Sequence, residues 1–353
     1  MALGRLNSTI EDYLEDHEDS PVRQDVLEFY FEVSHFLAIY DLVDENYVIY
    51  SQMEDDGSFI LKLFCVNHAR NLQECMARGR SSILFSATFL PIQYYKALLG
   101  GNAEDYEVYA HSVFRPEKLG LYIGSDVTSK YTRRSRTEYY NIASYIYEIV
   151  KNRHGNYMIF FPSHAFLRQV YESFLSYFAN EQMECILQED YMNEEAREAF
   201  LNRFVGNEDC DLEGMIHMEI EMEEEKSLLG FCVMGGIFGE GIDLKRDSLI
   251  GAIIVGTGLP QVCNEREILK QYFDEAGENG FDFAYRYPGM NKVLQAAGRV
   301  IRTAEDVGIV ALLDERFLTP SYQRLFPREW KNYEVVTTSQ AAKRIERFWN
   351  EWL

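Results

Sequence analysis

Apolar residues recur at helical spacing soon after a serine–proline pair at residues 20–21, which suits the start of a helix. We therefore predict a helix over residues 21–41 with a wide apolar face. Two β-rich runs, residues 47–51 and 59–65, flank an acidic turn cluster and predict a hairpin. A third apolar run, residues 82–85, leads into three small residues, as a strand leads into a tight turn.

Beyond residue 104, short apolar runs alternate with amphipathic segments. The short runs predict buried strands, and the longer segments predict helices. The expected strands are 157–161, 185–187, 228–234, 249–256 and 308–313, and the expected helices are 164–178 and 193–204. Strands that alternate with helices in this way favour an α/β fold with a parallel sheet flanked by helices on both faces, after an N-terminal helical and hairpin segment.

The charge balance restricts the kinds of partner. Lys and Arg total 34 and Asp and Glu total 57, which gives a net charge of −23. A chain this acidic does not suit non-specific coating of duplex DNA or an anionic membrane, so any contact with nucleic acid has to be local. A 47% apolar fraction is ample for a buried core, over a length that corresponds to about two domains.

The six cysteines are scattered, without a CxxC pair, and we interpret them as free thiols in a reducing cytoplasm. No run reaches the roughly 18 apolar residues that a membrane span needs, and the acidic start of the chain has no apolar leader region. The sequence thus predicts a soluble, cytoplasmic protein with no membrane partner.

The most informative segment is the motif Q-A-A-G-R-V-I-R at residues 295–302. On a helix, positions i, i+4 and i+7 lie on one face, so Gln295, Arg299 and Arg302 would project together. Gly298 would let a ligand come close. Two guanidinium groups and an amide suit phosphate oxygens, because guanidinium pairs with them bidentately and keeps its charge. Taken by itself, the pattern is also that of two surface arginines on an ordinary helix.

With its flanks, residues 283–290 and 305–317, this segment resembles motif VI of the XPD/DinG family of superfamily 2 DNA helicases, Q-x-x-G-R-x-x-R. The resemblance implies a RecA-like fold in which the motif reaches the phosphates of ATP. It implies that Gln295 and Arg299 contact the γ-phosphate and that Arg302 is the arginine finger. Such a finger stabilises charge on the transferred phosphoryl group and is worth about 10³ to 10⁵ in rate.

Other segments resemble the family's motifs in the expected order. Residues 235–243 are similar to motif V, and the resemblance places Glu240, Gly241 and Asp243 at the nucleotide, together with Gly298 of motif VI. A glycine-rich turn after a strand brings backbone amides close to a ligand. Considered without its neighbours, this turn is equally a flexible glycine loop.

Two shorter segments are similar to further motifs. Residues 156–163 resemble motif IV, where Ser163 would cap the next helix and the helix N-terminus would bind a DNA phosphate. His164 stands where the family more often has tyrosine. Ser86-Ala87-Thr88 resembles motif III, which in related helicases couples ATP turnover to DNA movement.

Lys130, Arg133 and Arg134 belong to a dense basic cluster that is interleaved with tyrosines. A basic surface with aromatic side chains suits single-stranded DNA. A solvated loop, or ion pairs within the chain, are equally open at this point. The DNA-binding candidates are Lys130, Arg133, Arg134, Ser163, His164 and Thr257, the last in the turn after the strand 249–256.

Neither G-x-x-x-x-G-K-[ST] nor D-E-[AG]-H occurs in the sequence. These motifs hold the phosphates and the Mg²⁺ of ATP, so we expect that the chain alone does not hydrolyse ATP. ATP and Mg²⁺ are then expected to be bound mainly by an absent first helicase domain. No set of four cysteines supports an iron–sulfur cluster in this chain, and the histidines show no metal-ligand spacing.

The economical interpretation is the C-terminal motor portion of a longer ATP-dependent DNA helicase that moves 5′ to 3′ on single-stranded DNA, as the family implies. Residues 1–47 would be the helical tail of an arch-like insertion, residues 48–103 the last strands of the first helicase domain, and residues 104–353 the second RecA-like domain. Residues 48–103 would then pack on the second domain or be poorly ordered, because unpaired strand edges need cover. The alternative is a non-catalytic RecA-like interaction module from a split or degenerate gene.

Overall fold

The computed structural model describes residues 2–18, 20–54, 56–205, 226–235 and 249–352. Glu240, Gly241 and Asp243, which were predicted to lie at the nucleotide, fall outside this described part. The chain forms two compact units. The first comprises Met1–Phe85, Gln93–Tyr106 and Cys263–Gly280, and the second comprises Ser86–Ile92, Glu107–Val262 and Phe281–Leu353.

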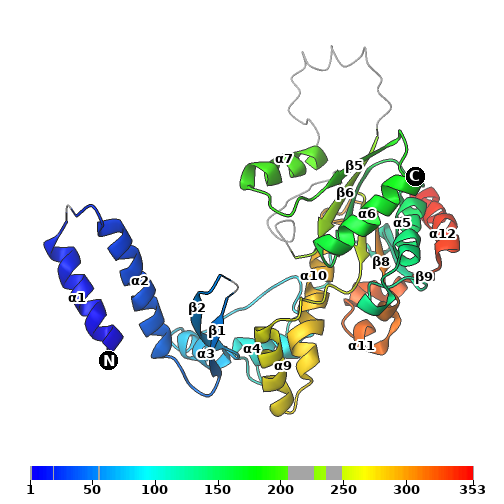
Figure 1. Cartoon of the computed structure of the whole chain (residues 1–353). Helices are drawn as coiled ribbons and strands as arrows, with labels where there is room; N and C mark the ends of the chain where they lie inside the picture. Colours follow the sequence, from blue (N-terminus) through cyan, green and yellow to red (C-terminus); the bar gives the residue numbers. More distant parts are fainter. Residues whose placement is uncertain (1, 19, 55, 206–225, 236–248, 353) are drawn as a thin grey trace, which may run out of the picture. The chain divides into compact units, whose positions relative to one another are not determined.

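The first unit begins with two helices that lie side by side, α1 (Ala2–Asp16) and α2 (Arg23–Tyr40), as Figure 1 shows. An antiparallel hairpin and three further helices follow. These elements are β1 (Tyr47–Met53), β2 (Phe59–Cys65), α3 (Ala69–Met76), α4 (Ile92–Leu99) and α9 (Asn264–Glu275). The predicted helix over residues 21–41 and the predicted hairpin are confirmed.

Helix α9 comes from far along the chain and is hydrogen-bonded to the hairpin. Tyr50 and Lys62 stand directly opposite each other on β1 and β2, and both donate to Oε1 of Glu265, over 2.6 and 2.7 Å. Tyr272, two turns further along α9, donates to Oδ1 of Asn46 over 2.7 Å, so one face of the helix carries both contacts. A segment that was expected to belong to the second RecA-like domain therefore packs in the first unit.

The Glu265 contact predicts an acid-sensitive step in the first unit. Hydrogen bonds from Lys62 and then from Tyr50 lower the pKa of the Glu265 carboxyl from 4.5 to about 2. A carboxyl with a lowered pKa stabilises the fold above its ordinary pKa, and this contribution is lost as the pH falls from 4.5 towards 2. We expect amide exchange in β1, β2 and α9, corrected for the intrinsic rate, to rise over that pH interval.

The variant Glu265→Gln is expected to show the raised exchange already at pH 7 and to lose the pH dependence. Glu275→Gln is the matched control, because the Glu275 carboxylate accepts a hydrogen bond from Gln271 of the same helix. Equal protection of the hairpin in Glu265→Gln and in the unchanged protein at pH 7 would contradict the prediction.

The apolar run 82–85 does not form a strand. It has no strand neighbour among the described residues, and Ile83 and Phe85 are 85% and 88% exposed. The strand expected before Ser86 is absent because an extended segment becomes a strand only where another strand supplies backbone hydrogen bonds. The expected tight turn does form, and the Thr88 N–H donates to Ser86 Oγ over 3.2 Å.

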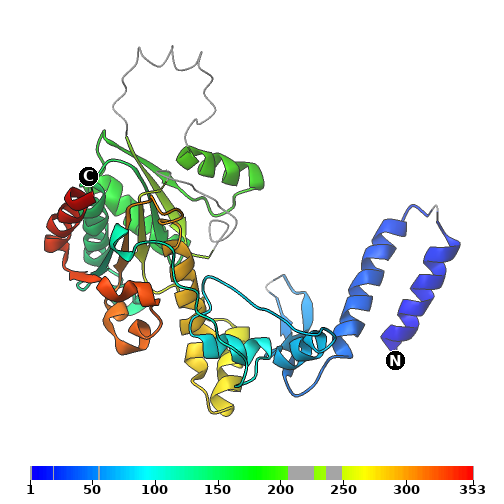
Figure 2. The same ribbon diagram turned by 180° about the vertical axis from the view of Figure 1, so that it is seen from behind.

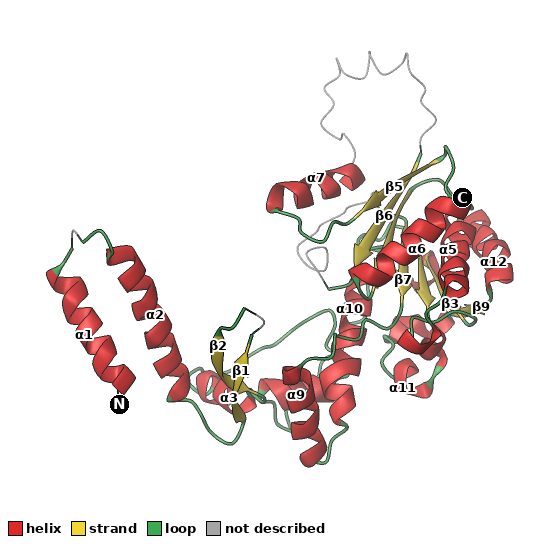
Figure 3. Ribbon diagram, viewed as in Figure 1, coloured by secondary structure: helices red, strands yellow, loops and turns green. Residues whose placement is uncertain are grey.

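The second unit is built on a parallel sheet, drawn in yellow in Figure 3. The sheet has seven strands in the order β5-β6-β4-β7-β8-β3-β9. The strands are β3 (Leu119–Gly124), β4 (Asn156–Phe161), β5 (Met183–Leu187), β6 (Ser227–Val233), β7 (Gly251–Val255), β8 (Gly308–Leu313) and β9 (Glu334–Val336). The predicted strands are confirmed as β4 to β8, and the predicted α/β fold with a RecA-like parallel sheet is confirmed with them. Strands β3 and β9 were not predicted.

Helices cover both faces of this sheet because each strand sends successive side chains to opposite sides. On β4, Met158 and Phe160 belong to one apolar core, and Ile159 and Phe161 belong to the other. Figures 1 and 2 show the covering helices from two sides. The first core is covered by α7 (Glu194–Val205) and α10 (Tyr287–Ala297), and the second by α5 (Arg136–Val150), α6 (His164–Tyr177) and α12 (Thr338–Trp352).

Candidate nucleotide and nucleic-acid site

Helix α10 carries the start of the Q-x-x-G-R-x-x-R motif and ends inside it. Gly298 is the C-terminal cap of the helix, and a short turn follows it. Arg302 lies beyond the helix, so the prediction that Gln295, Arg299 and Arg302 share one helical face is wrong. The physical reason is that the chain turns here to enter strand β8, and helix geometry no longer sets the direction of its side chains.

The two arginines of this motif differ in exposure but are electrostatic neighbours. Arg299 is 4% exposed, whereas Arg302 lies at the surface and Gln295 is half-buried. Burial lowers the pKa of the Arg299 guanidinium, and the positive charge of Arg302 lowers it further. Guanidinium groups bind anions with several oxygens well, because they donate in a planar fork and keep their charge. The two arginines of the motif are therefore candidates to bind a phosphate chain.

Asp306 fixes the loop between Arg302 and strand β8. Its carboxylate accepts hydrogen bonds from the backbone N–H groups of Arg302 and Thr303 and from the Thr303 hydroxyl, each over 2.7 Å. Burial disfavours the ionised carboxyl, but these hydrogen bonds outweigh burial and lower the pKa of Asp306. The backbone of Arg302 is thus held in place while its side chain stays exposed.

Glycines set the position of α10 against the loop that follows strand β7. Gly258 has a φ of +67°, which other residues rarely adopt, and a Cβ there would lie 2.4 Å from the carbonyl oxygen of Gly289. The loop and the first turn of α10 are therefore in direct backbone contact. This contact fixes the close packing of α10 against the loop that follows β7.

A buried polar network lies at the carboxyl edge of the sheet, where neighbouring parallel strands end together. Asp314 directly follows β8 and is fully buried; it accepts hydrogen bonds from Ser129 N over 2.8 Å and from Thr128 Oγ1 over 3.2 Å, in the segment after β3. Nε and Nη2 of Arg316 donate to the same carboxylate over 2.8 and 2.7 Å. Burial alone raises the pKa of Asp314, but the hydrogen bonds and charge of Arg316 outweigh burial and lower it.

The basic cluster that was predicted to bind single-stranded DNA follows this network in the chain. Lys130 Nζ lies 2.7 Å from a carboxylate oxygen of Glu315, and Arg133 Nη2 lies 3.3 Å from one of the buried Glu138. These two residues therefore form ion pairs within the chain, although their side chains stay 43% and 52% exposed. The guanidinium of Arg134 instead lies over two aromatic rings, those of Tyr131 and Phe166.

The remaining DNA-binding candidates lie in different environments. Ser163 accepts a hydrogen bond from the N–H of the third residue of α6, so the predicted N-cap is confirmed. His164 Nδ1 lies 3.1 Å from a carboxylate oxygen of Asp190. Thr257 is 1% exposed, and its hydroxyl accepts a hydrogen bond from Tyr322. A direct DNA contact by the Thr257 side chain does not fit this burial, because its surface is taken up by packing.

The residues of the buried network were not predicted from the sequence. Thr128, Ser129, Asp314 and Arg316 were not among the predicted site residues, although each lies just after a buried strand. Hydroxyl and carboxylate side chains that follow two apolar runs are the available signal, since adjacent parallel strands bring them to one edge. That signal needs the strand order, which pairs β3 with β8 across a long stretch of sequence.

Some kinds of site find no support in the described part of the chain. Its His, Cys, Asp and Glu side chains form no group of three that could hold a metal ion. None of the described helices has both the length and the apolar character needed to cross a bilayer. The described cysteines carry free thiols. The guanidinium, hydroxyl and backbone N–H groups above are therefore the candidate chemistry.

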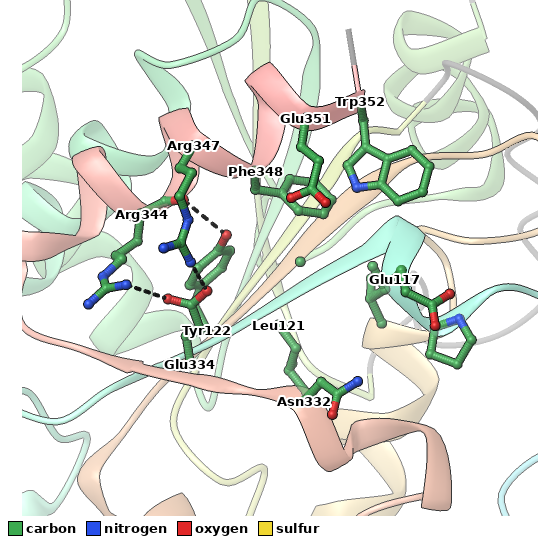
Figure 4. Close-up of a pocket in the computed structure, with 13 residues that line it drawn as sticks. Glu117, Leu121, Tyr122, Asn332, Glu334, Arg344, Arg347, Phe348, Glu351 and Trp352 are labelled. Atoms are coloured by element: carbon green, nitrogen blue, oxygen red, sulfur yellow. Dashed lines mark hydrogen bonds and ion pairs between the residues drawn. The ribbon is translucent and has the colours of Figure 1, made fainter.

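A pocket of about 200 Å³ lies beside the edge strand β9, between β3 and α12 (Figure 4). Glu334 lies 2.7 Å from Arg347 and 3.5 Å from Arg344, and the Tyr122 hydroxyl donates to the backbone oxygen of Arg344 over 3.3 Å. Both arginines pair with the one carboxylate of Glu334, and no residue of the helicase-like motifs lines the pocket. We assign the pocket to the packing of α12 on the sheet edge.

Taken together, a parallel sheet with helices on both faces, a polar carboxyl edge and two arginines directly after α10 define a RecA-like domain. Solved structures agree with this fold. The chain is similar to an XPD structure in its apo form, with a TM-score of 0.59 at 21% identity, over 93% of this chain and 61% of that chain. A second XPD helicase structure matches with a TM-score of 0.55 at 23% identity, over 93% and 55% of the two chains.

Residues 146–333 match the model of the helicase C-terminal domain family, and the chain belongs to this family. It is 28% identical to the ATP-dependent DNA helicase XPD of Sulfolobus acidocaldarius over 244 residues. The matched region covers 67% of this chain and 39% of that protein. It is 22% identical over 324 residues to a probable ATP-dependent helicase of Methanocaldococcus jannaschii, over 88% of this chain and 45% of that protein. The chain thus spans less than half the length of these relatives. The predicted resemblance to the C-terminal region of XPD/DinG-type helicases is confirmed.

Proposed function

We propose that this chain supplies the C-terminal motor part of an ATP-dependent DNA helicase that moves 5′ to 3′ along single-stranded DNA. The observation that carries the proposal is the placement of the two motif arginines directly after α10, where Arg299 is buried and Asp306 holds the backbone N–H of the exposed Arg302. The names of the relatives point to ATP as the anion that these arginines would bind, because those relatives are ATP-dependent helicases.

In this proposal, Gln295 and Arg299 bind the γ-phosphate of ATP, and Arg302 acts as the arginine finger. ATP supplies the phosphoryl group that is transferred to water. Asp306 holds the backbone of Arg302, and in this proposal the Arg302 guanidinium meets the charge that develops on the phosphate oxygens. The printed sequence has no Walker motif, so the loop that cradles the phosphates and the acidic residues for Mg²⁺ come from another part of the protein or from another chain.

The carboxyl edge of the sheet is the side that we propose for DNA. The α6 helix begins there at the Ser163 cap, and the free N–H groups of a helix N-terminus favour a phosphate. Lys130 and Arg133 belong to the segment that follows β3, and their side chains stay partly exposed. The net charge of −23 confines DNA to such a local surface, because the rest of the molecule repels it.

The experiment measures DNA binding and ATP turnover separately. The chain as printed is expected to bind single-stranded DNA with an affinity that falls as salt rises, and to leave ATP intact. The intact gene product, with everything that is translated in the same reading frame, is expected to hydrolyse ATP faster when single-stranded DNA is added. If the chain binds no DNA and the intact product shows no DNA-stimulated turnover, the protein is a non-catalytic interaction module instead.

A further inference from the structure

An aromatic and guanidinium column rises from the core of the second unit to its surface. Phe166 of α6 is 1% exposed, and the guanidinium carbon of Arg134 lies 4.8 Å from the centre of its ring. The same guanidinium carbon lies 5.3 Å from the ring centre of Tyr131, which is 83% exposed. The column therefore joins the buried Phe166 ring, the Arg134 guanidinium and the exposed Tyr131 ring.

Arg134 is placed by its stacking contacts rather than by ion pairing. Its Nε is buried and has no hydrogen-bond partner in the described part of the chain, whereas the neighbouring Lys130 and Arg133 each pair with a carboxylate. Phe166 packs in turn against Tyr139, and the two rings meet edge to face with their centres 5.5 Å apart. A flat side chain fixed on this support loses little conformational freedom when a second flat group stacks on it.

Burial does not explain the position of Tyr131. An aromatic ring that is 83% exposed contributes little hydrophobic stabilisation, and a surface cation–π contact contributes only about 0.5–1 kcal/mol. The ring nevertheless stands on the short 3₁₀ turn Tyr131–Arg133, between the buried network and the first residues of α5. Arg134 is shared with Phe166, which is the third residue of the helix capped by Ser163, so the column and that helix N-terminus belong to one local structure.

We propose that Tyr131 is a base-stacking platform that holds one nucleobase of single-stranded DNA, and this inference rests on the proposed function. Arg134 is the positioning residue that holds the ring, and the N-terminus of α6 is available to the adjoining phosphate. Stacking uses the π-face that every base has, so the platform accepts any sequence. A helicase motor needs such tolerance because it has to move along whatever strand it meets.

The test compares three variants of the chain in binding a fluorescent oligo(dT) strand, followed by anisotropy at fixed salt. Tyr131→Ala is expected to weaken binding about 5- to 150-fold, which is the range that ~1–3 kcal/mol per stacked base produces. Tyr131→Phe keeps the ring and is expected to stay within about twofold of the unchanged chain. Tyr191→Ala is the matched control, because Tyr191 is 94% exposed and has no ring contact among the described residues.

Two further measurements separate stacking from a structural or electrostatic effect. A strand that carries abasic sites throughout is expected to bind equally to the unchanged chain and to Tyr131→Ala, because it offers no base. The slope of binding against salt is expected to be the same in both, since a phenol ring contacts no phosphate charge. A changed urea midpoint in Tyr131→Ala, or a loss on the abasic strand as large as on oligo(dT), would assign Tyr131 to the fold and overturn the inference.

The outcomes also separate this inference from the proposed function. If the unchanged chain binds no single-stranded DNA, the proposed function and the platform are both wrong. If the unchanged chain binds DNA and Tyr131→Ala binds as well as Tyr191→Ala, the platform is wrong and the proposed function stands.

Discussion

Arg302→Ala in the intact gene product is expected to lower DNA-stimulated ATP hydrolysis by about 10³- to 10⁵-fold, because an arginine finger contributes that much to phosphoryl transfer. DNA binding is expected to change little, since Arg302 lies after α10 and not in the edge loops that we propose for DNA. Its side chain is exposed, so the substitution is expected to leave the fold intact. The measurement is the initial rate of phosphate release at saturating ATP and single-stranded DNA.

Two variants sharpen this prediction. Arg302→Lys keeps a positive charge but not the planar fork, so it is expected to recover only part of the rate. Arg347→Ala is the matched control, because Arg347 is an exposed arginine paired with Glu334 at the edge of the sheet. Turnover by Arg302→Ala at the rate of Arg347→Ala would refute the finger assignment and leave the fold and the family membership unaffected.

Asp314→Asn is expected to produce the largest loss of stability, about 3–5 kcal/mol of the free energy of unfolding of the second unit. The neutral side chain leaves the charge of Arg316, whose side chain is only 18% exposed, without its carboxylate. The amide also brings a donor towards the Ser129 N–H, which is itself a donor. Both effects act inside the fully buried network, where water does not replace the lost partner.

Tryptophan fluorescence during urea unfolding measures this effect, because Trp330, Trp349 and Trp352 all lie in the second unit. Asp190→Asn is the control: Asp190 is 38% exposed in its pair with Arg168, and such surface pairs contribute about 0–1 kcal/mol. The pKa of Asp314 is lowered in the fold, so the difference between the unchanged protein and Asp314→Asn should shrink as the pH falls below the ordinary carboxyl range. Equal urea midpoints at pH 7 would show that the network adds nothing to stability.

The sheet of the second unit could be predicted well because its strands are apolar throughout. All six residues of β8 are buried, and such a run has only one stable place, between two layers of helices. Strand β9 was missed because it has three residues, of which Val335 is 49% exposed, so it leaves no apolar run to recognise. The apolar run 82–85 was taken for a strand because hydrophobicity reports what a segment would bury, and not whether a neighbouring strand is there to pair with it.

The sequence alone was enough to predict the class of fold, the cap at Ser163 and the resemblance of residues 295–302 to a helicase motif. These features depend on residues a few positions apart, whose geometry the backbone fixes. Only the tertiary structure decided that α10 ends before Arg302, that α9 joins the hairpin through Glu265, and that Asp314 closes a network with Ser129. These contacts join residues far apart in sequence, and their energies depend on burial and charge that exist only once the strands are paired.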